Sequence, residues 1–177
     1  MSDIAKWELL GIPVIFILGF ILHEAYDISG KNPIVALIAP VNESVWEHLK
    51  MAASAVFIFA FLEYFFIGRF SPNFILGKTL SILTVPLLIM VLHYGYKIIT
   101  GTHVLFLDIL ILLVAIIVGQ MLSYFILNMP QKYLFLNEIA LVLSVIIISG
   151  FFYYTYYPPQ MPVFMDSTTG KYGIIRF

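Results

Sequence analysis

Histidine and carboxylate side chains are the groups in this sequence that could carry out chemistry. The chain has four histidines, ten acidic residues and no cysteine, which excludes disulfides, thiolate nucleophiles and cysteine-ligated metals. Any metal ion would therefore be held by imidazole nitrogens and carboxylate oxygens, which divalent ions such as zinc accept as ligands. A water bound to such an ion is a hydrolytic nucleophile.

A first group of these residues is the segment His23-Glu24-Ala25-Tyr26-Asp27. His23 and Asp27 are four positions apart, which places both on one face of a helix. The segment resembles a variant of the zincin motif H-E-x-x-H, in which two ligands share a face and the glutamate polarises a water. Asp27 stands where the motif has its second histidine. The alternative interpretation is a hydrogen-bonded His–Asp pair at a helix end.

A second group consists of Glu43, Glu47, Lys50 and Ser54, whose spacing predicts one inward-facing helical stripe. Two carboxylates one turn apart repel each other unless a cation lies between them or one is protonated. The cation could be a metal ion, or it could be Lys50 in a structural Glu–Lys network, and both interpretations stay open. His48 points about 100° away from Glu47 on a helix, so a straight helix is not expected to direct both at one ion.

Long apolar segments must position these groups. Hydrophobic residues make up 62% of the chain and charged residues 11%, with a mean hydropathy of +1.01, whereas soluble domains are roughly 45–50% apolar and about 25% charged. A bilayer core needs roughly 20 apolar helical residues. Windows of that kind occur at 9–26, 45–66, 74–98, 104–127 and 134–156. The sequence therefore predicts an all-α, polytopic transmembrane helix bundle with about five spans.

The joints between these spans complete the predicted architecture. Most are short, so consecutive spans are expected to be antiparallel neighbours in a single transmembrane domain, residues 1–177. The apolar segment 31–40 is too short to cross and is interpreted as a short interfacial or re-entrant helix. Prolines at 158, 159 and 162 prevent the fifth span from continuing. The tail, residues 157–177, is expected to fold back over one end of the bundle.

Alternation of the spans brings all four histidines and six carboxylates to one side. Ionisable groups at membrane depth are costly and usually face a bundle interior or a wet cavity, so the sequence predicts a polar pocket near that membrane face. The predicted metal ligands are His23, Asp27, Glu43, Glu47 and His93. The predicted general bases are Glu24 and Glu47. The predicted pocket residues are Asn42, Lys50, His48, His103 and Asp108.

Three classes of function are compatible with such a pocket. The first is hydrolysis of a lipid or another membrane-associated substrate, with a divalent ion, zinc, as the expected cofactor. The second is ion- or proton-coupled transport or the binding of a small ligand. The third is a structural or accessory subunit without activity, in which the polar layer sets helix register. Charged residues on the opposite side, such as Glu63, Lys78 and Glu138, are interpreted as ordinary interfacial pairs.

Composition also limits the expected partners. The formal net charge of -1 provides no basic field for a polyanion, which argues against nucleic acid. Membrane lipid is the expected partner, and a lipid or small molecule is the expected substrate. Lysine and arginine are nearly balanced between the two sides, so neither orientation is predicted. The oligomeric state is left open.

Three segments carry a family resemblance. They are the stretch from His23 to Asp27, the sequence P-V-N-E-S-V-W-E-H-L-K from Pro40 to Lys50, and D-S-T-T-G-K-Y-G at 166–173. With its N-E-S-x-W-E-H signature, the chain resembles an uncharacterised family of small polytopic membrane proteins from Gram-positive bacteria, over most of its length. The resemblance implies a multi-pass protein of a bacterial plasma membrane. It implies no mechanism, because the family has no assigned activity.

Overall fold

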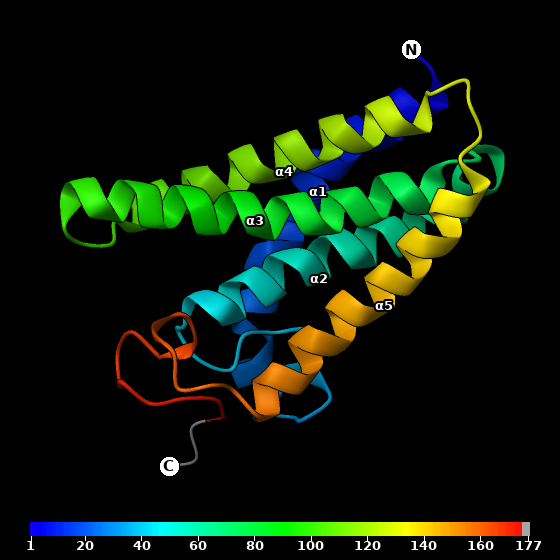
Figure 1. Cartoon of the computed structure of the whole chain (residues 1–177). Helices are drawn as coiled ribbons and strands as arrows, with labels where there is room; N and C mark the ends of the chain where they lie inside the picture. Colours follow the sequence, from blue (N-terminus) through cyan, green and yellow to red (C-terminus); the bar gives the residue numbers. More distant parts are fainter. Residues whose placement is uncertain (175–177) are drawn as a thin grey trace.

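A computed structural model describes residues 1–174 and contains five long helices (Figure 1). They are α1 (Asp3–Ile28), α2 (Val45–Tyr64), α3 (Phe74–Thr100), α4 (Leu105–Leu127) and α5 (Leu134–Tyr156). Each is long and apolar enough to cross a membrane. The predicted all-α fold with five spans is confirmed, and every boundary except the start of α1 lies within two residues of its predicted position.

The first helix begins six residues before its predicted start. Ser2 caps it by accepting a hydrogen bond from the Ala5 amide at 3.2 Å, and Lys6 pairs with Asp3 at 2.8 Å. Glu8 is buried inside the bundle. The hydropathy window excluded these charged residues, but local capping and internal partners let the helix continue through them.

The helices pack as one bundle around α2 and α3. α3 lies along α4 and also contacts α2 and α5, while α1 packs against α2 and α4. Glycines allow the close approach of α3 and α4. A Cβ on Gly119 would lie 2.6 Å from Val85 Cγ2, and one on Gly77 would overlap Leu127. Small residues have this role in helix pairs generally, because they let the two backbones come together.

The second helix is the most enclosed. In its most apolar window 61% of the residues are buried, against 11% for α5, which flanks the bundle (Figure 1). The core comprises side chains of all five helices, with Phe151 as the buried member from α5. They include Ile15 of α1, Ala52, Val56 and Phe59 of α2, Val85 of α3 and Ile116 of α4. Residues near the start of α2 are therefore placed firmly relative to α1.

The connection from α1 to α2 and the C-terminal tail meet at one end of the bundle (Figure 1). The helix expected at 31–40 is a single 3-10 turn, η1 (Val35–Leu37). After α5 the tail forms another 3-10 turn, η3 (Pro162–Phe164). There Phe164 packs on Trp46 and Tyr154, with ring centroids 4.6 Å and 5.5 Å apart. The tail thus covers the start of α2, and residues 175–177 of the predicted tail lie outside the described part.

Candidate functional site

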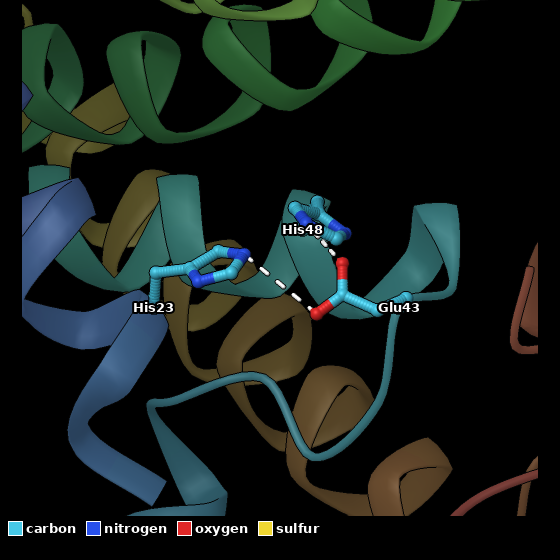
Figure 2. A group of neighbouring side chains, drawn as sticks. All are labelled: His23, Glu43 and His48. Atoms are coloured by element: carbon cyan, nitrogen blue, oxygen red, sulfur yellow. Dashed lines mark ion pairs between the residues drawn. The ribbon is translucent and has the colours of Figure 1, made fainter. Parts of the chain in front are cut away.

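Three side chains converge where α1 ends and α2 begins (Figure 2). His23 comes from the last turns of α1, Glu43 from the connecting segment and His48 from the first turn of α2. Glu43 Oε1 is 3.8 Å from His23 Nε2, and Glu43 Oε2 is 3.5 Å from His48 Nε2. One ligand atom from each residue lies within 4.8 Å of the other two. Among residues 1–174 this is the one group of three or more such side chains close enough to share a metal ion.

The hydrogen bonds of the two imidazoles define which ring nitrogen carries a proton. His48 Nδ1 lies 2.9 Å from the Ser44 carbonyl oxygen, which can only accept. His23 Nδ1 lies 2.9 Å from Glu24 Oε1. Each Nδ1 is therefore the donor, and in a neutral ring each Nε2 presents its lone pair to Glu43. A carboxylate or carbonyl behind the ring is the usual partner of a metal-ligating histidine.

The spacing of the facing atoms suits a metal ion. N–H···O hydrogen bonds join atoms 2.7–3.2 Å apart, and the distances to Glu43 are longer, at 3.5 and 3.8 Å. A tetrahedral zinc ion with ordinary bond lengths holds its nitrogen and oxygen ligands about 3.4 Å apart. Two lone pairs directed at an ionised carboxylate also repel it, so a cation between them relieves the repulsion.

The group of three is open to solvent on one side. The side chains of His23, Glu43 and His48 are 34%, 47% and 33% exposed. A polar depression of about 120 Å³ borders His23 and Glu43. Its lining residues are His23, Glu24, Tyr26, Asp27, Pro40, Val41, Asn42 and Glu43. An ion held by these three ligands would keep a coordination position for water or a substrate oxygen.

The C-terminal tail fixes the backbone at Glu43. Asp166 Oδ2 accepts a hydrogen bond from the Glu43 amide at 2.8 Å, and the Asn42 side chain donates to the Gly173 carbonyl at 2.9 Å. Burial alone would raise the pKa of Asp166, but hydrogen bonds from Thr168, Glu43 and Thr169 outweigh it and hold the pKa at about 2. Asp166 is therefore an ionised acceptor over the physiological pH range.

Glu47 is placed away from the group of three. It was predicted as both a ligand and a base, yet its Oε2 pairs with Lys50 Nζ at 2.6 Å and accepts from the Val41 amide at 3.0 Å. Lys50 also donates to Thr155 and to the Ala36 carbonyl. Of the two interpretations of this helix, the structural Glu–Lys pair is the one that the geometry favours for Glu47. Lys50, predicted as a pocket residue, is fully buried in that pair.

The start of α2 explains why Glu43 and Glu47 separate. Ser44 is the N-cap and accepts from the Glu47 amide, so Glu43 precedes the helix. Helical spacing therefore does not apply to Glu43, and its side chain turns towards His48. The spacing Ser44-x-x-Glu47 is that of a capping box, a signal in the sequence that would have placed Glu43 outside the helix.

His93, predicted as a ligand, belongs to a second cluster with Asp108 and His103. His93 Nδ1 and the Tyr96 hydroxyl both lie 2.8 Å from Asp108 Oδ1, and His103 Nδ1 lies 3.6 Å from Oδ2. The end of α3 and the start of α4, which bear this cluster together with the turn between them, lie apart from the start of α2 (Figure 1). Alternation of the helices brings both clusters to one side, but α3 and α4 diverge from α1 and α2 there.

The other predicted residues surround the group of three. Glu24 is exposed and contacts His23 from behind, while Asp27 and Asn42 line the depression. The zincin-like arrangement differs from the predicted one, because the partner of His23 Nδ1 is Glu24. Asp166 and Ser44, which hold Glu43 and His48 in place, were not among the predicted site residues.

Comparison with known proteins identifies a family whose function is unknown. The model of a family described as "Family of unknown function (DUF6512)" matches residues 1–174. No curated protein and no solved structure matches the chain. The expected membership of an uncharacterised family is confirmed at this level, while the Gram-positive origin stays a prediction. Since the match extends over nearly the whole sequence, the chain belongs to this family of unknown function.

Proposed function

We propose that this chain is a multi-pass membrane protein that binds a divalent metal ion, zinc, through His23, Glu43 and His48. The observation that carries the proposal is the orientation of the two imidazoles. Each has its Nδ1 held by an acceptor and its Nε2 directed at one shared carboxylate. Two histidines and one glutamate with an open position are a ligand set of catalytic zinc.

The proposed reaction is hydrolysis of a lipid or another membrane-associated substrate. A bound zinc ion lowers the pKa of its water to about 7 and polarises a substrate oxygen. In this proposal Glu24 orients His23, and Asp27, which lines the same depression, accepts the proton that the attacking water releases. Glu47 is not part of the machinery, because Lys50 and Val41 engage it.

The position of the group suits a substrate that lies in a bilayer. The group of three is half-exposed at the end of two helices that are apolar enough to span a membrane. A lipid headgroup could reach the depression while its chains lie along the exposed apolar faces of the helices. We place the protein in a bacterial plasma membrane, as the family resemblance implies.

Transport is the less favoured alternative. It requires a polar path from the site to the far end of the bundle. In the middle of the bundle, the described buried side chains of α1, α2, α3 and α4 include no ionisable group. Most are apolar, among them Ile15, Val56, Val85 and Ile116, and the polar exceptions are the hydroxyls of Ser54 and Ser81. This apolar layer supports a site that acts at one face.

Metal binding is tested on the purified full-length protein in detergent. Elemental analysis, and zinc titration of chelator-treated protein by calorimetry, are expected to give one zinc per chain. Binding should be lost in Glu43→Gln and His48→Ala and retained in His93→Ala, the matched control from the second cluster. Absence of stoichiometric zinc, or its retention in Glu43→Gln, would refute the metal site.

Hydrolysis is tested with the zinc-loaded protein in vesicles of phosphatidylglycerol and phosphatidylethanolamine, with lipid products measured by mass spectrometry. We expect products that require zinc and that fall in Asp27→Asn, a variant expected to keep its metal. Stoichiometric zinc without any lipid product would remove phospholipid hydrolysis and leave a metal-binding membrane protein.

A further inference from the structure

A further set of ionisable side chains, distinct from both the group of three and the second cluster, is buried at the opposite end of the bundle from the group of three. Glu8 near the start of α1, Glu63 near the end of α2 and Lys78 near the start of α3 meet there. Their exposed fractions are 3%, 0% and 4%. Lys78 Nζ lies 2.7 Å from Glu8 Oε1 and 2.6 Å from Glu63 Oε2. Lys78 therefore points into the bundle, so the predicted ordinary interfacial pairing does not describe this cluster.

The formal charges of this cluster do not balance. Two carboxylates share one ammonium group, which leaves one negative charge if all three are ionised. The neighbouring helices supply no further titrating group among the described residues. α4 faces the cluster with the Ser123 hydroxyl and the Gln120 amide. On α5, which packs against α3, the nearby polar side chain is Asn137, bonded to the backbone of Leu76 and Pro72.

Three carboxylate oxygens in the cluster also lack a hydrogen-bond partner. Among residues 1–174, nothing forms a hydrogen bond to Glu8 Oε2 or to either oxygen of Glu63, although all three atoms are buried. Glu8 Oε1 accepts from both Lys78 and Ser123, at 2.7 and 2.6 Å, whereas Glu63 has the ammonium group alone. An ionised carboxylate in a dry interior needs several donors, and a protonated one does not.

We propose that Glu8, Glu63 and Lys78 form a buried proton-binding site, in which the two carboxyl groups hold a single proton at neutral pH. Glu63 is its principal carrier, because Glu8 has the additional donor that stabilises an ionised carboxylate. The ligand is a proton and not a metal cation, since the ammonium group of Lys78 already occupies the position between the carboxylates. One protonated carboxyl, one carboxylate and one ammonium give a neutral cluster.

The location of the site gives proton binding a structural consequence. Each of the three residues comes from a different helix, and the cluster joins α1, α2 and α3. Release of the proton would leave an uncompensated negative charge among them, and such a charge in a low-dielectric interior destabilises the fold. The contact between these helices is therefore expected to weaken in alkaline solution. This site is separate from the proposed zinc site, and neither proposal depends on the other.

Infrared spectroscopy of the full-length protein in detergent tests the proposal, because a protonated carboxyl has a C=O band distinct from that of a carboxylate. In the wild type at neutral pH we expect one buried carboxylic acid band that disappears at alkaline pH. Glu8→Gln and Glu63→Gln each leave one carboxylate paired with Lys78. Both variants should therefore fold and both should lose the band. Asp3→Asn, which removes an exposed carboxylate of the same helix, is the matched control and should keep it.

The two glutamine variants together separate a shared proton from one held by burial alone. If the band survives in Glu8→Gln, Glu63 is protonated without help from its neighbour, and the shared site is refuted. A wild type without any acid band at neutral pH would show three ionised groups, and this too would overturn the proposal. Neither result affects the zinc measurements, which concern the other end of the bundle.

Discussion

Two clusters on one side of this bundle each combine two histidines with one carboxylate, but their hydrogen bonding differs. The group of three joins His23, Glu43 and His48, and the second cluster joins two further histidines to Asp108. In the second cluster both histidines face Asp108 through Nδ1, and Tyr96 also donates to it. In the group of three the Nδ1 atoms are bonded elsewhere, and both Nε2 atoms face the carboxylate of Glu43. The comparison teaches that the direction of the ring nitrogens, more than residue content, distinguishes a candidate metal site from a satisfied hydrogen-bond network.

Removal of a proposed metal ligand should have the largest effect on zinc binding. His48→Ala should abolish zinc binding, because two remaining ligands in a half-exposed site do not compete with water. The corresponding change in the second cluster, His103→Ala, should leave zinc affinity unchanged. Calorimetric titration of both variants with zinc measures the difference. Equal losses in the two variants would mean that the clusters are not distinct.

Glu47 provides the next test, because it neighbours Glu43 in sequence but lies in a buried ion pair. Glu47→Gln should destabilise the fold by about 3–5 kcal/mol, since it leaves the Lys50 ammonium buried and uncompensated. Zinc affinity of the folded fraction should change little. Thermal unfolding in detergent measures the first effect.

The double variant Glu47→Met, Lys50→Met is the control for this second test. It removes both charges and should recover most of the lost stability. A Glu47→Gln protein of normal stability that no longer binds zinc would instead place Glu47 among the ligands.

Glu24 should have an intermediate effect. Glu24→Gln weakens the acceptor behind His23 without removing a ligand, and loss of such a partner typically lowers metal affinity by roughly 10–100-fold. Tyr96→Phe makes a comparable change next to Asp108 in the second cluster and should not alter zinc affinity. An unchanged affinity in Glu24→Gln would argue that His23 does not bind the metal through Nε2.

Loss of the Asp166 charge in the tail should have the smallest effect, a local release of the tail from the start of α2. Because the pKa of Asp166 is lowered in the folded state, from 3.8 to about 2, its stabilising contribution is complete above about pH 4 and is lost as the pH falls towards 2. Fluorescence of Trp46, on which Phe164 packs, should report release of the tail over that range in a Trp7→Phe background. Asp166→Asn should show the released signal at neutral pH, and a signal that stays constant down to pH 2 would contradict this role.

Much of the fold follows from the sequence because a bilayer sets a length requirement that composition reveals directly. Four of the five predicted spans begin and end within two residues of α2, α3, α4 and α5. α1 begins before the predicted window at 9–26 because Glu8, a charged residue just outside that window, is paired with Lys78 inside the bundle. Hydropathy treats each residue separately and so does not detect partners that are distant in the chain.

The sequence predicted the side of the bundle on which the candidate site lies, but not which residues form it. Alternation of apolar helices by itself determines that His23, Glu43 and His48 share one side of the bundle, since the chain must cross and return. Only the tertiary structure decided that Glu43 turns outwards to two imidazoles while Glu47 turns inwards to Lys50. The physical reason is that a side chain's partner depends on the cap, the connecting loop and the docked tail, and these contacts join residues as far apart as Glu43 and Asp166.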